Sequence, residues 1–278
     1  MPALFLKWLI KDKIALTGSL LLLAIVTVAI LAPYVSPYPP NEQHVLHTLE
    51  NPSSTYLLGT DQYGRDLLSR ILWAARPSLI VGLVSVSSAM VGGMLLGMLA
   101  GYFGGLTDHL VMRTVDITLS FPSLVLGLMI AVVLGGGLIN TIIAISITFV
   151  PRFARLARGS TVSIKENYYV EAGRALGSNS FEIFTRHLLP NIIGPDLVVA
   201  TLWVGQAIRL EAGLSFLGMG VQPPTPSWGN MLKAGVDNIL RASHLALYPG
   251  LCIVVAVLAF NLLGDSLRDQ IDPTLRRS

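Results

Sequence analysis

Charged side chains are scarce in this sequence. Asp, Glu, Lys and Arg make up 13% of its 278 residues, whereas soluble domains carry about 25%. Hydrophobic residues reach 53%. This balance excludes an ordinary soluble domain and predicts a membrane protein, because charged groups are costly in hydrocarbon. Four windows contain no charged residue at all: 14–41, 77–107, 117–151 and 242–264.

The uncharged windows predict an all-α membrane protein with six transmembrane helices. A helix needs about 20 apolar residues to cross about 30 Å of hydrocarbon. The third window is too long for one crossing and is interrupted by three consecutive glycines, so we divide it into two spans. The predicted spans are 14–32, 78–102, 117–134, 138–157, 195–221 and 245–263.

Basic residues are distributed unequally between the two sides of these spans. Lys and Arg gather in cytoplasmic loops. The richer side, which includes Arg152 and Arg155, is therefore predicted to be cytoplasmic, together with both termini and segment 169–191. The net charge is only +3, and no stretch interleaves basic with aromatic residues, so nucleic acid is not expected as a partner. The other side carries Arg65, Arg70, Arg76, Lys233 and Arg241.

Few residues are suited to catalysis or metal binding. The one cysteine, Cys252, lies inside an apolar span and is expected to be a core residue. The five histidines are scattered, so no metal site is expected. None of the lysines follows a glycine, as the lysine of a phosphate-binding loop does. We therefore expect no catalytic residue and no cofactor bound by this chain, and ATP hydrolysis would need another subunit.

Residues 58–103 predict two consecutive helices. Segment 58–79 begins as a turn and continues as an amphipathic helix, which we expect to lie at the outer interface and to lead into the second span. Within that span, glycines recur at intervals of four and would let a neighbouring helix approach closely. They are Gly93, Gly97, Gly101 and Gly105.

A polar segment, Tyr169 to Asn191, separates two apolar regions. Its pattern predicts two short helices broken at Gly177, with Asn179 or Ser180 as the N-cap of the second and Glu182 in its first turn. Such a polar segment cannot lie in hydrocarbon. It is therefore predicted to protrude, and a protruding segment on a membrane protein is a candidate for contact with a partner.

Five further residues are candidates for a pathway or gate. Ionisable residues inside predicted spans are functional candidates by default. The fifth span contains two of them, Arg209 and Glu211, which are two residues apart and therefore point to different faces of the helix. Arg113 and Asp116 lie near the third span, three residues apart, and are placed to pair on one face of the helix. A proline in the third span is placed to kink the helix. They are Arg209, Glu211, Arg113, Asp116 and Pro122.

The polar segment resembles the EAA loop of ATP-binding cassette (ABC) importer permeases, with which these subunits contact their ATPases. Glu171, Ala172, Gly177, Leu189 and Pro190 fit the pattern. Two positions depart from it, because a glycine replaces the third alanine and a histidine replaces the isoleucine before Leu-Pro. By this resemblance the coupling residues are Tyr169, Glu171, Ala172, Gly173, Ala175, Gly177, His187, Leu189 and Pro190.

Three more segments, 58–79, 211–232 and 260–276, resemble the second permease subunit of dipeptide, oligopeptide and nickel importers, the DppC/OppC-like family. The resemblance implies a type I importer fold in a bacterial inner membrane. It also implies a second permease, two ATPase subunits that hold ATP and Mg²⁺, and an external solute-binding protein. The implied cargo is di- or oligopeptides, with nickel or a metal chelate as the alternative. Residues 1–76 would form an N-terminal helix with an external loop and interfacial helix, and residues 77–278 the permease core.

A different class of function is suggested by Gly213–Phe216 together with His244. Ser215 and this histidine superficially resemble the Gly-x-Ser and His dyad of intramembrane serine proteases. A serine nucleophile needs its base within hydrogen-bond reach. A serine-directed covalent probe would separate the two classes, because it should label Ser215 of the purified chain only if the chain is such a protease.

Overall fold

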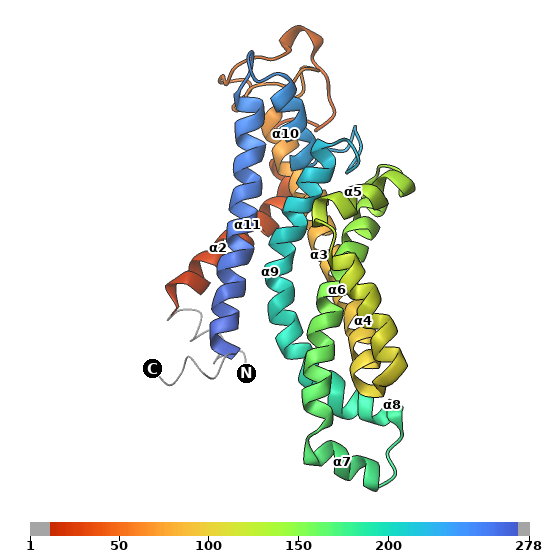
Figure 1. The fold of residues 1–278 in the computed structure, drawn as a ribbon. Coiled ribbons are helices and arrows are strands. Elements are labelled where there is room, and N and C mark those ends of the chain that lie inside the picture. Colours follow the sequence, from red (N-terminus) through yellow and green to blue (C-terminus); the bar gives the residue numbers. More distant parts are fainter. Residues whose placement is uncertain (1–11, 272–278) are drawn as a thin grey trace.

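The computed structural model describes residues 12–271, and over this range the chain is helical apart from its loops and one isolated bridge between Thr60 and Asp66. Figure 1 shows an elongated bundle in which α3, α6, α9 and α11 follow the long axis. Loop 36–66 and α10 cover one end, called here the loop end, and α7 and α8 form the other. The elements are α2 (Lys13–Val35), a 3₁₀ turn η1 (Val45–His47), α3 (Leu67–Phe103), α4 (Gly105–Leu119), α5 (Ser123–Leu134), α6 (Leu138–Lys165), α7 (Tyr168–Ala175), α8 (Ser180–Ile183), a π-helical turn η2 (Phe184–Leu188), α9 (Leu189–Phe216), α10 (Trp228–Asp237) and α11 (His244–Ile271).

The predicted spans correspond to helices, with one exception. Five helices in the described range are long and apolar enough to cross a membrane, and α2, α6 and α11 begin within one residue of the predicted boundaries. The exception is the third span, which is not one helix. There α4 and α5 meet at an angle of 98°, and together they make a sixth, broken span.

The break between α4 and α5 corrects the role predicted for Pro122. We expected a kink within a continuous helix, but α4 ends at Leu119 and Pro122 precedes the first residue of α5. Proline lacks an N–H and disfavours helical geometry in the residue before it, so the hydrogen-bond ladder stops at this point. With 12 residues, α5 is about 18 Å long and too short to cross the membrane alone.

Helix α3 also differs from its prediction. Segment 58–79 does not form a separate interfacial helix, because a single helix of 37 residues starts at Leu67, where the Asp66 side chain accepts a hydrogen bond from the Ser69 N–H. Leu67 and Ile71 are buried in the core instead of facing an interface. The expected boundary between residues 76 and 77 falls inside this helix.

Three glycines bring α3 against α6. A Cβ added to Gly97 would lie 2.3 Å from the Ala154 carbonyl oxygen, and Cβ atoms on Gly93 and Gly101 would also meet α6. Gly105 is not part of this stripe, because α3 ends at Phe103 and Gly105 begins α4 with φ +51°. Small residues therefore fix the closest helix pair of the bundle.

The first and last helices of the described range are joined. The Ser266 hydroxyl of α11 donates to the Asp12 carboxylate, which caps α2 and accepts from the Ile14 and Ala15 N–H groups. The Ser266 bond is the main reason that the pKa of the Asp12 carboxyl lies below its usual value. Figure 1 places these two helix ends toward the end of the bundle that carries α7 and α8.

Candidate functional site

The polar segment forms a compact protrusion, called here the knob, of residues 168–188. It consists of α7, a turn, α8 and η2. Gly177 makes the turn with φ +91°, a region that L side chains rarely adopt. Asn179 then caps α8 in a reciprocal capping box with Glu182, which confirms one of the two predicted caps. Two short helices broken at Gly177 are therefore what the sequence pattern produces.

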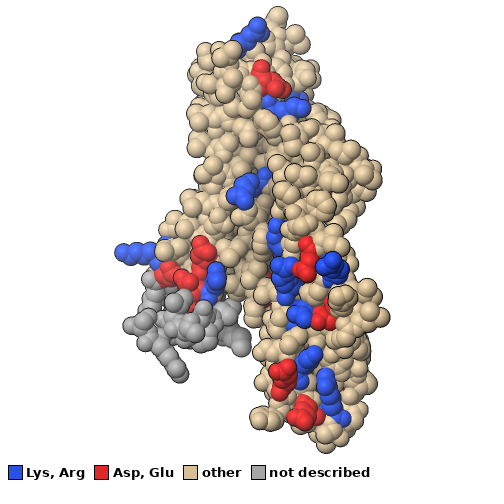
Figure 2. Space-filling view, in the orientation of Figure 1, with Lys and Arg blue, Asp and Glu red and all other residues tan. Residues whose placement is uncertain are grey.

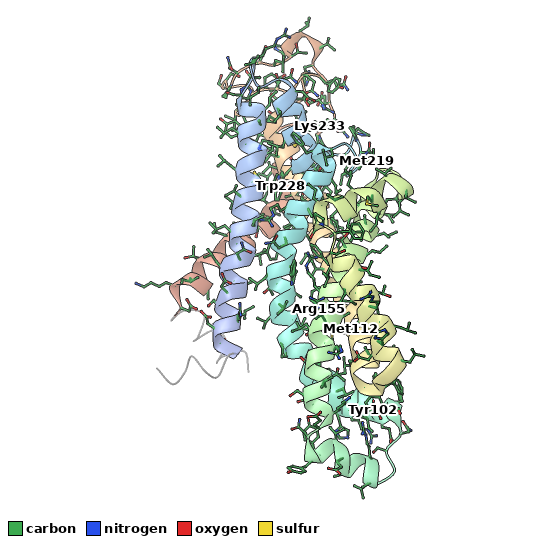
Figure 3. The ribbon with its side chains drawn as sticks, in the orientation of Figure 1. Tyr102, Met112, Arg155, Met219, Trp228 and Lys233 are labelled. Carbon is green, nitrogen blue, oxygen red and sulfur yellow. The ribbon has the colours of Figure 1, made fainter. Side chains whose placement is uncertain are left out.

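A small core of its own fixes the knob to the bundle. The last turn of α3 meets the knob around Tyr102, whose hydroxyl lies 3.4 Å from Ser180 Oγ. The centre of the Tyr102 ring is 5.0 Å from the centre of the Phe184 ring and 5.0 Å from the Arg174 guanidinium. Figure 3 shows Tyr102 at this junction. The buried members of the core are Met94, Met98, Ala157, Val170, Ile183, Leu188 and Ile192.

The second half of the knob is continuous with the fifth span. Residues 180–216 form one helical rod of 37 residues, because the π-helical turn η2 joins α8 to α9 without a break. Measured along its path, at a rise of 1.5 Å per residue, this helical run is about 55 Å long. The knob is therefore joined to α9 by helix, without an intervening loop.

The outer surface of the knob carries three large apolar side chains among its exposed charged residues. Tyr168, Leu176 and Phe181 are 87%, 89% and 75% exposed. Of the coupling residues, Gly173, His187 and Leu189 are half-buried, whereas the others are exposed. The exposed coupling residues are Tyr169, Glu171, Ala172, Ala175, Gly177 and Pro190.

The two departures from the EAA pattern meet in space. The His187 ring packs 5.8 Å from the Tyr169 ring, and a Cβ on Gly173 would lie 3.3 Å from His187 Nε2. That distance is tighter than an ordinary van der Waals contact. The glycine therefore leaves room for a histidine ring, which reaches further from its backbone than the usual isoleucine side chain does.

The candidates Arg113 and Asp116 do not pair as predicted. Asp116 accepts from Arg155 of α6 at 2.5 Å, and Arg158 of α6 forms a two-pronged pair with Asp108 of α4 at 2.5 and 2.6 Å. Figure 3 shows Arg155 beside Met112 of α4, and Figure 2 shows acidic and basic side chains gathered over this part of the molecule. The interhelical partners are available because α4 lies along α6.

Arg209 and Glu211 occupy different faces of α9, as predicted. Glu211 is fully buried, and its Oε1 accepts from the Ser215 hydroxyl at 2.7 Å. Ser215 also accepts from the Val221 N–H at 3.1 Å. His244 lies elsewhere, with its Nε2 2.7 Å from a Cβ built on Gly59. The hydroxyl of Ser215 is therefore engaged by Glu211, and the serine–histidine dyad of a protease is not formed.

Arg209 lines a cavity of about 590 Å³ between α5, α6 and α9. A second arginine, Arg152, lies in the same cavity, with its guanidinium 4.6 Å from the Trp203 ring centre and its Nη2 2.6 Å from Ser123 Oγ. Arg152 was not among the predicted site residues, because its charge had placed it with the basic residues of the cytoplasmic side. The available signal was its position inside the predicted span 138–157. The lining residues are Ser123, Leu124, Phe149, Arg152, Trp203, Gln206, Arg209, Leu210 and Gly213.

Two family models match this chain. The first, described as "Binding-protein-dependent transport system inner membrane component", matches residues 93–277. The second, described as "N-terminal TM domain of oligopeptide transport permease C", matches residues 3–52. Together they cover the knob, the cavity and every span except α3, of which residues 67–92 lie outside both matches.

Several curated proteins are similar over nearly the whole chain. The di/tripeptide transport system permease protein DppC of Pseudomonas aeruginosa is 46% identical, with 96% of this chain and 90% of the relative covered. The glutathione transport system permease protein GsiD of Pectobacterium atrosepticum is 40% identical, with 98% and 91% covered. The dipeptide transport system permease protein DppC of Alkalihalophilus pseudofirmus is 41% identical, with 97% and 89% covered.

A solved structure shares the fold. An inward-facing structure of the MetNI methionine ABC transporter matches with a TM-score of 0.58 and 21% identity, covering 74% of this chain and 98% of the matched chain. The predicted all-helical importer permease fold is thereby confirmed. On the evidence of the family models and the relatives, the chain belongs to the family of binding-protein-dependent transport system inner membrane components, as a multi-pass protein of the bacterial inner membrane.

Proposed function

We propose that this chain is one of two permease subunits of an ATP-driven importer of di- or oligopeptides, and that its knob docks an ATPase subunit. The observation that carries the proposal is the exposed apolar surface of Tyr168, Leu176 and Phe181 on a protrusion continuous with α9. Large exposed apolar side chains on a protrusion mark an interaction site. The names of the relatives, which refer to peptides and to glutathione, support a peptide cargo.

The remaining partners follow from the same proposal. ATP and Mg²⁺ would be held by two ATPase subunits, since no lysine of this chain stands in a phosphate-binding loop. A second permease would complete the pathway, and a solute-binding protein would deliver the peptide on the loop side. With the knob in the cytoplasm, both chain termini would be cytoplasmic as well.

The proposed coupling is rigid-body movement. When the ATPases close on ATP, they displace the knob, and the small core around Tyr102 transmits the displacement to α3 while the continuous rod transmits it to α9. Both helices belong to the main bundle. The pathway would then alternate between inward-open and outward-open states.

The test is to remove the apolar surface without altering the fold. Leu176→Ser and Phe181→Ser are made singly, with Leu240→Ser as the matched control, because Leu240 is 99% exposed and precedes α11 at the loop end. Burial of one such side chain contributes about 1.5–3 kcal/mol. Each knob variant should therefore weaken co-purification of the ATPases at least tenfold, and ATP-driven peptide uptake into proteoliposomes should fall with it.

The control variant should assemble and transport like the parent. Parent-like assembly and uptake in both knob variants would overturn the docking role. Absence of ATP-driven peptide uptake by the complete parent complex would overturn the cargo assignment instead.

A further inference from the structure

The cavity between α5, α6 and α9 is unusual in its charge. Two arginines line it, and no acidic residue is among its lining residues. Elsewhere in the described range, the arginines that join α4 to α6 are paired, Arg155 with Asp116 and Arg158 with Asp108. The described residues offer no ion pair to Arg152 or Arg209. Both lie inside spans, where an unpaired charge is costly.

Arg152 is held in position but retains free donors. Its guanidinium lies over the rings of Phe149 and Trp203, at 5.2 and 4.6 Å from their centres. It donates to the Thr148 carbonyl oxygen and to Ser123 Oγ. A guanidinium has five N–H donors, so three have no partner among the described residues. The aromatic faces and these two bonds orient the planar group.

Arg209 is the more open of the pair. Its guanidinium donates to Gln206 Oε1 one turn earlier on α9, and its side chain is exposed in the single chain. An exposed arginine at this depth of a span cannot face lipid at low cost. It must therefore face either a water-filled pathway or a neighbouring subunit.

The chemistry of the cavity selects its ligand. A guanidinium fork binds a carboxylate with two parallel hydrogen bonds, which lysine cannot do. Apart from Ser123 and Gln206, the remaining lining is apolar or aromatic, as suits the uncharged part of a peptide. Every linear peptide carries a terminal carboxylate whatever its side chains. An importer of varied peptides needs such a sequence-independent contact.

We infer that Arg152 and Arg209 form a half-site in the pathway that binds the C-terminal carboxylate of the peptide in transit. This inference rests on the proposed function. Its alternative, a carboxylate of the second permease as the partner of Arg209, is separated by the test below.

The test compares a peptide acid with its amide. Complete complexes carrying Arg209→Gln, Arg209→Lys or Arg152→Gln are reconstituted in proteoliposomes with saturating solute-binding protein. Uptake of Ala-Ala-Ala and of its C-terminal amide is then measured. The same binding protein delivers both cargoes to every variant, so its own preference cancels when acid-to-amide ratios are compared. Arg241→Gln is the matched control, because Arg241 is exposed and does not line the cavity.

The parent should favour the acid about tenfold, the scale expected for hydrogen bonds to a charged group. Both Gln variants should bring the acid-to-amide ratio toward one, Arg209→Lys should retain part of it, and Arg241→Gln should leave it unchanged. An unchanged ratio in both Gln variants overturns the half-site. Equal loss for both cargoes, with less second permease co-purified, also overturns it and assigns Arg209 to the subunit contact. If the parent takes up neither peptide, the proposed function fails first.

Discussion

Gly177 gives the sharpest test of coupling through the knob. Its φ of +91° is disfavoured for any L side chain, yet no heavy atom lies within 4 Å of a Cβ built there. A substitution would therefore strain only the backbone, without a steric clash. The left-handed region costs a non-glycine residue about 1–2 kcal/mol, and more for a β-branched residue. Gly177→Val should relieve this strain by moving the turn and misplacing α8.

The effect of Gly177→Val should stay local. The turn is exposed, whereas the core around Tyr102 is buried, so membrane insertion and the thermal unfolding temperature should remain close to those of the parent. Uptake of peptide and substrate-stimulated ATP hydrolysis should fall together, by about five- to thirtyfold for a misplacement energy of about 1–2 kcal/mol. Both are measured on the same proteoliposomes, together with co-purification of the ATPases.

Two controls separate strain, bulk and location. Gly137→Val introduces the same kind of strain far from the knob, because Gly137 precedes α6, has φ +137° and has no heavy atom within 4 Å of its Cβ. Gly159→Val adds the same bulk in open space within α6, without positive φ. Parent-like transport by Gly177→Val would refute the reasoning. So would an equal loss in Gly137→Val, because the defect would then be general.

Three further results are expected. Gly97→Ala should destabilise the bundle by about 1–3 kcal/mol in thermal unfolding in detergent, because its Cβ would meet the backbone of α6 at 2.3 Å. Gly92→Ala is the control and should be close to neutral in the same assay, because its Cβ would meet only a side chain, at 3.5 Å. In cells whose outer membrane has been permeabilised, a cysteine introduced at Ser53 should react with an impermeant maleimide, whereas one introduced at Leu176 should not. The reverse labelling pattern would show that the predicted membrane orientation is wrong. Glu171→Lys should weaken ATPase co-purification by reversing an exposed charge in the first turn of α7, and unchanged binding would place the contact elsewhere on the knob.

The sequence alone determined those features that depend on local chemistry. Uncharged stretches of about 20 residues favour membrane spans, so the first residues of α2, α6 and α11 could be placed to within one residue, whereas all three helices extend beyond their predicted ends. Asn179 and Gly177 act on their own turn of the chain, through a capping hydrogen bond and a positive φ. Such signals are complete within a few residues, and they located the knob before its surroundings were known.

Only the tertiary structure decided the features that depend on distant partners. Asp116 sits three residues from Arg113 but pairs with Arg155, 39 residues away, because α4 lies along α6. The bend before Pro122 brings Ser123 to the guanidinium of Arg152, so a residue that counted as a cytoplasmic charge became part of a cavity. Charge patterns report which side of a membrane a residue prefers, whereas packing between helices determines what that residue touches.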